Sequence, residues 1–74
     1  MRNITLTAVI EREGNGYVAL CPELDIASQG DSRTEAKANL LEAVSAFLEV
    51  ADETEINQRL NTERYVENLE VHVA

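Results

Sequence analysis

The sequence is poor in the residue types that cross-link small proteins or serve as catalytic groups and metal ligands in them. It contains one Cys, one His, one Pro and no Trp. A single Cys cannot close an intramolecular disulfide, so the chain is not a disulfide scaffold of the secreted kind. One Cys and one His also cannot supply the three or four soft ligands of a zinc site. We therefore expect neither a disulfide framework nor a zinc centre.

Long apolar runs are missing as well. No stretch approaches the roughly 20 apolar residues that a membrane helix needs. The first 14 residues, MRNITLTAVIEREG, alternate apolar and polar positions instead of forming the apolar segment of a signal peptide. The sequence thus predicts a cytoplasmic protein.

Positive charge is scarce. Six Lys and Arg stand against 14 Asp and Glu, giving a net charge of -8 and a pI near 4.4. Such a field repels phosphate backbones, so direct DNA binding is not expected. Two interpretations remain open: the charge attracts a basic protein partner, or it serves solubility alone.

Length and composition favour one small globular domain covering residues 1–74. Hydrophobic residues make up 45% of the chain and charged residues 27%. A domain of this size buries only about 60% of its unfolded surface, so its own core is marginal. We expect a homodimer or a higher homo-oligomer.

Strand patterns dominate the first third of the chain. Residues 4–11 alternate with the period of a half-buried strand, and the Gly-Asn-Gly segment 14–16 suits a hairpin turn. Residues 2–22 are therefore predicted to form a β-hairpin, which Pro22 ends because proline cannot donate to a sheet ladder. Residues 25–29 are predicted as a short third strand.

A helix signal follows. Ser32 as N-cap and Glu35 three residues later form the Ser-x-x-Glu capping box. Beyond it, apolar residues recur at spacings of three and four, which predicts one face packed on a sheet. This stripe consists of Ala36, Leu40, Val44, Phe47, Leu48 and Ala51.

The last third is predicted to contain a short helical turn over residues 53–60 and a final strand over 69–73, where Leu69, Val71 and Val73 alternate with polar residues. The expected fold class is α+β: a small antiparallel sheet in the order βββ-α-short α-β, with one main helix on one face.

No catalytic set is evident. Cys21 and His72 lack a local motif, and we interpret Cys21 as a small buried hydrophobe and His72 as a solvated side chain. The pair Glu23 and Asp25 and the acidic residues 52–55 lack the spacing of a calcium loop. We therefore expect no enzyme, no metal and no cofactor.

Several motifs occur in the order typical of the HicB-like antitoxin family, which this chain resembles over about half its length. They are a Gly-rich hairpin leading to a Tyr, a Pro-Glu-Leu turn, a Ser-Gln-Gly segment and a Glu-Ala-x-x-Asn-x-x-Glu-Ala helix. In this chain they are residues 14–17, 22–24 and 28–30, with Glu35, Ala36, Asn39, Glu42 and Ala43.

The resemblance implies a protein that neutralises a HicA-like toxin, a small basic ribonuclease that cleaves mRNA, by masking its active-site His. It also implies a fold similar to a partial ribonuclease H fold. Family members often carry a C-terminal DNA-binding module, for which the final residues LEVHVA leave no room, so operator binding by this chain alone is not expected. The alternative is an orphan HicB-like domain that acts as an oligomeric adaptor or regulator.

Four acidic residues lie within or next to these motifs in the sequence. Glu23, Asp25, Asp31 and Glu35 are predicted to form an acidic edge beside the third strand that binds the basic partner. Ser32 and Glu35 are assigned in addition to the helix cap. The acidic residues 52–55 are the alternative binding cluster.

Overall fold

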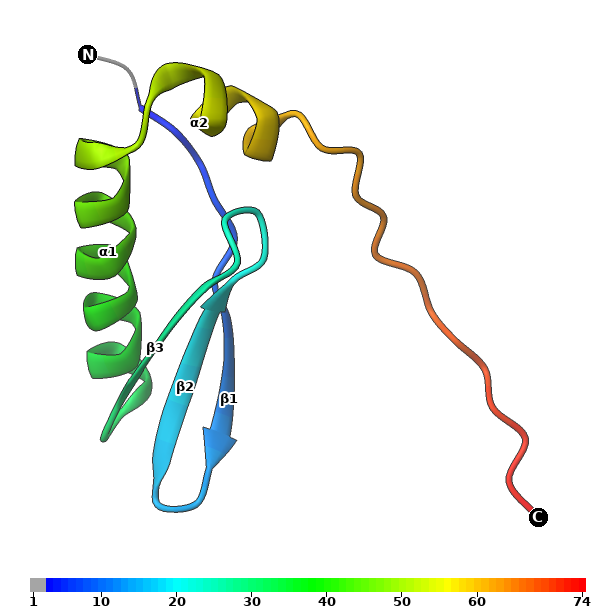
Figure 1. The fold of residues 1–74 in the computed structure, drawn as a ribbon. Helices are drawn as coiled ribbons and strands as arrows, with labels where there is room; N and C mark the ends of the chain where they lie inside the picture. Colours follow the sequence, from blue (N-terminus) through cyan, green and yellow to red (C-terminus); the bar gives the residue numbers. More distant parts are fainter. Residues whose placement is uncertain (1–2) are drawn as a thin grey trace.

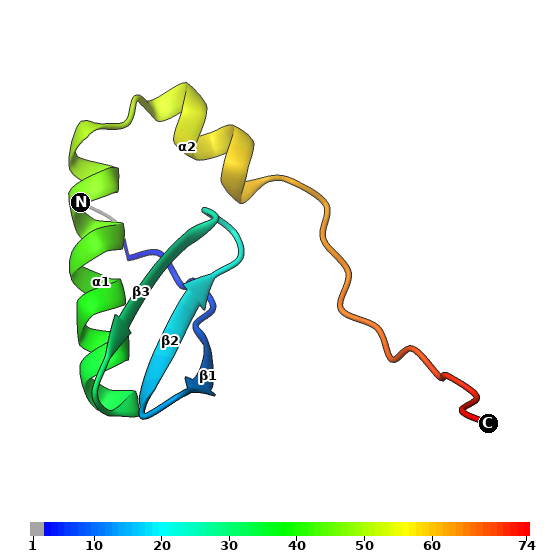
Figure 2. The same ribbon diagram turned by 60° about the horizontal axis from the view of Figure 1, so that its bottom comes forward.

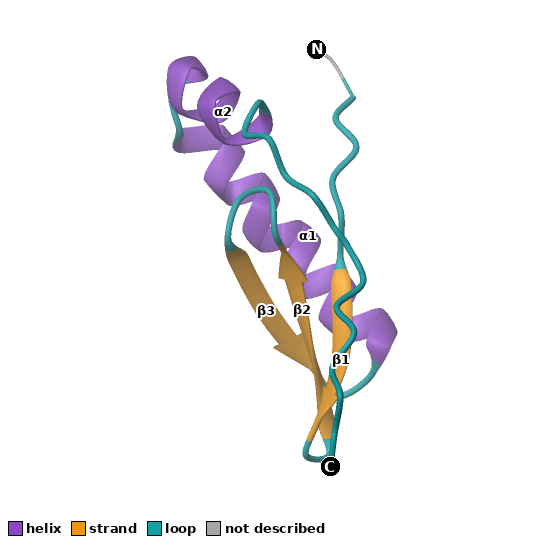
Figure 3. Ribbon diagram, turned by 90° about the vertical axis from the view of Figure 1, so that its right-hand side faces the viewer, coloured by secondary structure: helices purple, strands orange, loops and turns teal. Residues whose placement is uncertain are grey.

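A computed structural model describes residues 3–74 and contains five elements of secondary structure. They are β1 (Val9–Glu13), β2 (Gly16–Cys21), β3 (Ile26–Gly30), α1 (Arg33–Val50) and α2 (Glu53–Leu60). The strands form an antiparallel sheet in the order β1-β2-β3, and α1 lies across one face of it (Figure 1, Figure 3). The predicted α+β class, with the main helix on the sheet, is confirmed.

The hairpin is shorter than the sequence predicts. Its turn lies at residues 14–15, and Gly14 adopts a φ of 60°, a left-handed conformation that glycine tolerates best. β1 begins only at Val9, whose partner is Leu20. β2 ends at Cys21, one residue after Leu20. Residues 3–8 therefore have no strand opposite them and form no β-sheet hydrogen bonds. The predicted strand start at residue 2 lies outside the described residues.

Small and branched apolar side chains fill the space between sheet and helix. Ala19 and Cys21 alternate toward α1 along β2, and Leu24 reaches in from the turn that follows. The helix contributes the stripe that its three-four spacing predicts. Its buried members are Ala36, Leu40 and Val44, with Phe47 and Leu48 partly buried beside them.

Glycines permit a close approach where the sheet meets the start of α1. A Cβ atom on Gly30 would lie 2.6 Å from the backbone nitrogen of Ala36, and one on Gly16 would lie 2.9 Å from the carbonyl oxygen of Gly30. Neither contact is sterically possible without a shift of the backbone. The start of β2, the end of β3 and the first turn of α1 are therefore stacked at a distance that only glycine allows.

Arg59 anchors α2 to the rest of the fold. Its guanidinium donates to the carbonyl oxygen of Leu24 at 2.6 Å, forms an ion pair with Glu55 at 3.2 Å, and lies 5.0 Å from the centre of the Phe47 ring. These contacts join α2 to the β2–β3 turn and to α1. The predicted short helix over residues 53–60 is thus confirmed.

The predicted final strand over residues 69–73 is wrong. Residues 61–74, here called the extended arm, leave the end of α2 and run away from the body of the molecule without entering the sheet (Figure 1, Figure 2). Alternating apolar residues favour an extended backbone, but a strand also needs a neighbour that satisfies its N–H and C=O groups. The described chain offers this segment no such neighbour.

Candidate functional site

The four acids of the predicted edge lie at two ends of one strand. Glu23 and Asp25 belong to the turn that precedes β3, whereas Asp31 and Glu35 follow it. A strand of five residues spans about 16 Å at roughly 3.3 Å per residue. The structure therefore brings these acids together as two separate pairs.

Glu23 is held by the N-terminal segment. Its carboxylate accepts hydrogen bonds from the backbone N–H of Thr7 at 3.1 Å and from the Thr7 hydroxyl at 2.6 Å. Partial burial is the largest single influence and raises the pKa of Glu23, but the hydrogen bonds from Thr7, from the backbone and from the Cys21 thiol together outweigh it and lower that pKa. Glu23 is thus a structural tie between residues 3–8 and the β2–β3 turn.

Asp25 owes its place to backbone geometry. Its φ is 55°, in the left-handed region where Asp and Asn are the best tolerated residues after glycine. The side chain is exposed at the end of the turn. The turn alone therefore explains an Asp at this position.

The second pair lines a polar depression of about 680 Å³ at the other end of the sheet, here called the acidic hollow. Glu13 joins Asp31 and Glu35 there, and no Lys or Arg is among the residues that line it. Arg12 lies close by, with its guanidinium 5.9 Å from the centre of the Tyr17 ring. The other lining residues are Gly16, Tyr17, Val18, Ser28, Gln29, Gly30 and Asn39.

The walls of the acidic hollow are fixed by the helix cap. The Ser32 hydroxyl accepts from the Glu35 backbone N–H at 3.1 Å. The Glu35 carboxylate accepts from the N–H of Asp31 at 3.2 Å, one residue earlier than a standard capping box would have it. Across the hollow, the Asn39 amide donates to the carbonyl oxygen of Gln29 at 2.8 Å, which joins α1 to β3.

Glu13 was not predicted from the sequence as a site residue. It reaches the hollow through strand register: Glu13 pairs with Gly16, and the next residue, Tyr17, pairs with Gly30. A two-residue turn at 14–15 fixes the first pairing. The hairpin signal alone could therefore have placed Glu13 opposite the start of β2, but the β2–β3 register lies outside local sequence information.

The alternative acidic cluster, residues 52–55, is engaged in building α2. The Asp52 carboxylate caps the helix by accepting from the backbone N–H of Glu55 at 2.8 Å, and Glu55 forms the ion pair with Arg59. In residues 3–74 no group of three or more His, Cys, Asp or Glu side chains is arranged to hold a metal ion.

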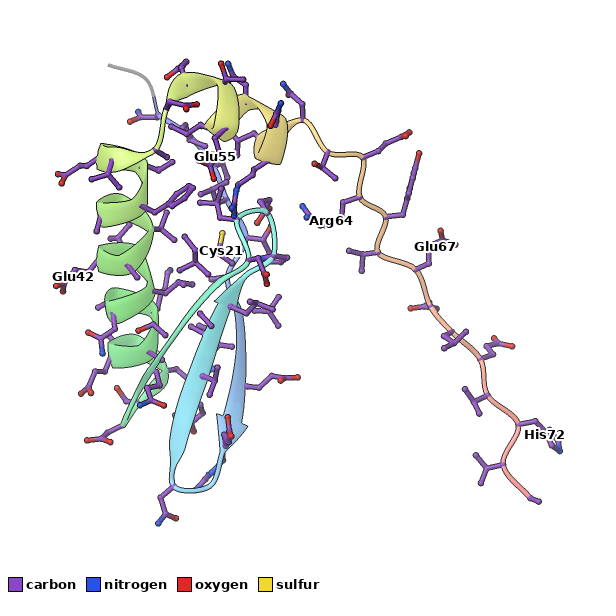
Figure 4. The ribbon with its side chains drawn as sticks, in the orientation of Figure 1. Cys21, Glu42, Glu55, Arg64, Glu67 and His72 are labelled. Carbon is purple, nitrogen blue, oxygen red and sulfur yellow. The ribbon has the colours of Figure 1, made fainter. Side chains whose placement is uncertain are left out.

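Cys21 and His72 lie far apart. The Cys21 thiol is 1% exposed beneath α1, where burial raises its pKa, and it donates to Glu23 at 3.5 Å. His72 lies on the extended arm, well away from the core (Figure 4). The structure therefore does not assemble these two residues into one site.

One curated protein provides a comparison for the sequence. The UPF0150 protein ssl0738 of Synechocystis is 50% identical to this chain over 46 residues. This chain therefore has a UPF0150 relative. The match covers 60% of this chain and 64% of the relative, so it spans less than two thirds of the relative's length. No family model matches the chain, and no solved structure matches it. Among the described residues, no helix is long and apolar enough to cross a membrane.

Proposed function

We propose that this protein is a HicB-like binding protein that captures a small basic HicA-like toxin through the acidic hollow. The proposal makes the chain an inhibitor by association, with no chemistry of its own. The partner would place a Lys or Arg side chain between the carboxylates of Glu13, Asp31 and Glu35, and the net charge of -8 would steer its approach.

One observation carries the proposal: seven of the ten residues that line the acidic hollow belong to the motifs that give the chain its resemblance to HicB-like antitoxins. The Gly-rich hairpin supplies Gly16 and Tyr17, the Ser-Gln-Gly segment supplies residues 28–30, and the helix motif supplies Glu35 and Asn39. Packing accounts for the glycines, the helix cap uses Glu35, and the bond to the Gln29 carbonyl uses Asn39. None of these contacts involves the side chains of Ser28 and Gln29. A shared partner surface would require them.

Rigid walls support the same function. The glycine stacking and the bond from Asn39 to Gln29 hold both sides of the hollow in place before a partner arrives. Preorganised groups lose little conformational entropy on binding, so charged contacts there contribute more of their energy to affinity.

The test removes two charges from the hollow without touching the cap. The double variant is Glu13→Gln, Asp31→Asn. Both side chains are exposed in the parent, so the substitutions should not disturb the core. The backbone N–H of residue 31 can still donate to Glu35. Because exposed acidic charges attract a basic partner before contact, we expect the association rate with a HicA-like toxin to fall about tenfold at low salt and its salt dependence to weaken. Stopped-flow or surface-binding kinetics at two ionic strengths measure both.

The matched control is Glu42→Gln, Glu49→Gln, which removes the same number of charges from exposed positions of α1 outside the hollow. Equal slowing in the two double variants would show that only net charge matters and would reject the hollow as the binding site. If the parent protein binds no HicA-like toxin from its own genome, the adaptor or regulator function is favoured instead.

A further inference from the structure

Two segments of the chain have the sequence pattern of a strand but no strand partner. Residues 3–8 alternate Ile4 and Leu6, both half-buried, with exposed Thr5 and Thr7. Residues 65–74 alternate Leu69, Val71 and Val73 with polar residues. Neither segment pairs with any other part of the described chain.

An apolar groove of about 460 Å³ runs between the first of these segments and α1. Residues 3–8 form one wall, and Leu41, Val44 and Leu48 of α1 form much of the other. Leu41 is 67% exposed at this groove although it is a large apolar side chain. Part of the apolar surface of α1 is therefore not covered by the sheet.

The extended arm does not cover the groove of its own chain. Its large apolar side chains are between 70% and 96% exposed, and the arm projects away from α1 in both views (Figure 1, Figure 2). A monomeric protein seldom leaves so many apolar side chains together in solvent. These residues are Tyr65, Val66, Leu69, Val71 and Val73.

We propose that residues 65–74 of one copy bind as an added strand beside residues 3–8 of a second copy, with Leu69, Val71 and Val73 in the groove. The exchange is reciprocal. The two copies are related by a two-fold axis, and the arm of each copy binds in the groove of the other. It pairs the facing N–H and C=O groups of both segments at once, while the N–H of Thr7 stays bonded to Glu23.

Charge complementarity favours this occupant. Lys37 is the single charged residue among those that line the groove, in a chain that is otherwise strongly acidic. Residues 65–74 contain Glu67 and Glu70 and no Lys or Arg. Glu67 shares its strand face with Leu69, the face directed into the groove, so the arm carries negative charge toward a positive group.

Interface size and chain path favour a second copy as the source of the strand. The groove and the arm together would engage roughly twenty residues of each subunit, the number found in interfaces of standard size. Arg59 fixes the end of α2 on the β2–β3 turn, from which the arm leaves in the direction away from its own groove (Figure 1).

The experiment uses the whole chain and light scattering coupled to gel filtration at tens of micromolar. The parent should have twice the 8.2 kDa mass of the chain. An arm variant, Leu69→Ser with Val71→Ser, and a groove variant, Leu41→Ser, should each be monomeric. The control Asn68→Ser with His72→Ser changes the polar face of the same arm and should stay dimeric. All four changed positions of the arm and Leu41 are exposed, so folding does not depend on them.

Mixing then identifies which copy supplies the strand. The arm variant keeps an intact groove and the groove variant keeps an intact arm, so an equimolar mixture should form a heterodimer that retains one strand–groove contact. A monomeric parent would overturn the proposal and would show that the arm binds its own groove or none. Dimers that persist in both variants, or a mixture that stays monomeric, would overturn it as well.

Discussion

The carboxylate of Glu23 illustrates how a single side chain connects distant parts of this fold. Thr7 is 16 residues away in sequence, yet its backbone N–H and its hydroxyl both donate to Glu23. These hydrogen bonds hold residues 3–8 near the sheet, where these residues form one wall of the apolar groove. The predicted role of Glu23 as a solvated binding residue is therefore secondary to its role in the fold.

The pH dependence of stability should show the Glu23 contribution. Its hydrogen bonds favour the ionised form, so its pKa is lower in the folded than in the unfolded chain. A group of this kind stabilises the fold above its ordinary value of 4.5 and loses that contribution as the pH falls through its lowered pKa. Glu23→Gln should therefore lower Tm at pH 7 and flatten the decline of Tm below about pH 4.5.

Thermal melts from pH 3 to pH 7 measure this effect. The matched control is Glu42→Gln, because Glu42 projects from α1 into solvent (Figure 4) and accepts no hydrogen bond in the described structure. If both variants have the same pH profile, the contacts with Thr7 contribute nothing to stability.

At the scale of elements, α1 depends on its first turn. The Ser32 hydroxyl satisfies one of the N–H groups that have no partner within the helix. Removing it in Ser32→Ala should cost about 1 kcal/mol of global stability, since α1 supplies half of the core cluster and the sheet cannot remain folded without it. Urea unfolding followed by circular dichroism measures the loss.

The comparison variant is Asp52→Ala, which removes the equivalent cap of α2. Because α2 buries only Ile56 among its residues, we expect fraying of α2 and a smaller change in the global midpoint. Equal losses for the two caps would mean that the two helices unfold as one unit with the sheet.

Local signals account for the elements that the sequence predicts well. A capping box, a glycine turn and a three-four apolar spacing each act within a few residues, and they predict α1 and the hairpin turn correctly. Strand extent is different, because residues 3–8 and 69–73 have strand patterns whose pairing depends on a distant edge. The candidate site follows the same rule: Asp31 and Glu35 adjoin the helix signal, whereas Glu13 arrives through the register of three strands.

At the scale of the whole molecule, the main electrostatic feature is the excess of acidic over basic residues, which gives a net charge of -8. Every charged side chain of the described residues is at least partly exposed, so the excess of acids is spread over the surface. The body is thin, with principal extents of 50 × 31 × 16 Å including the arm. Across its two shorter dimensions, like charges lie within about one screening length of each other at low salt, where that length is about 30 Å. Folding therefore works against self-repulsion.

Salt should consequently stabilise this protein. Raising NaCl from 10 to 150 mM shortens the screening length to about 8 Å and weakens repulsion more in the compact state than in the expanded unfolded chain, so Tm at pH 7 should rise by several degrees. Near the pI of about 4.4 the net charge vanishes, and the same change in salt should leave Tm nearly constant, which is the internal control. A Tm that falls with salt at pH 7 would show that attractive pairs such as Arg59 with Glu55 outweigh the net charge. A rise of equal size at both pH values would point to salt-strengthened apolar burial instead of screening.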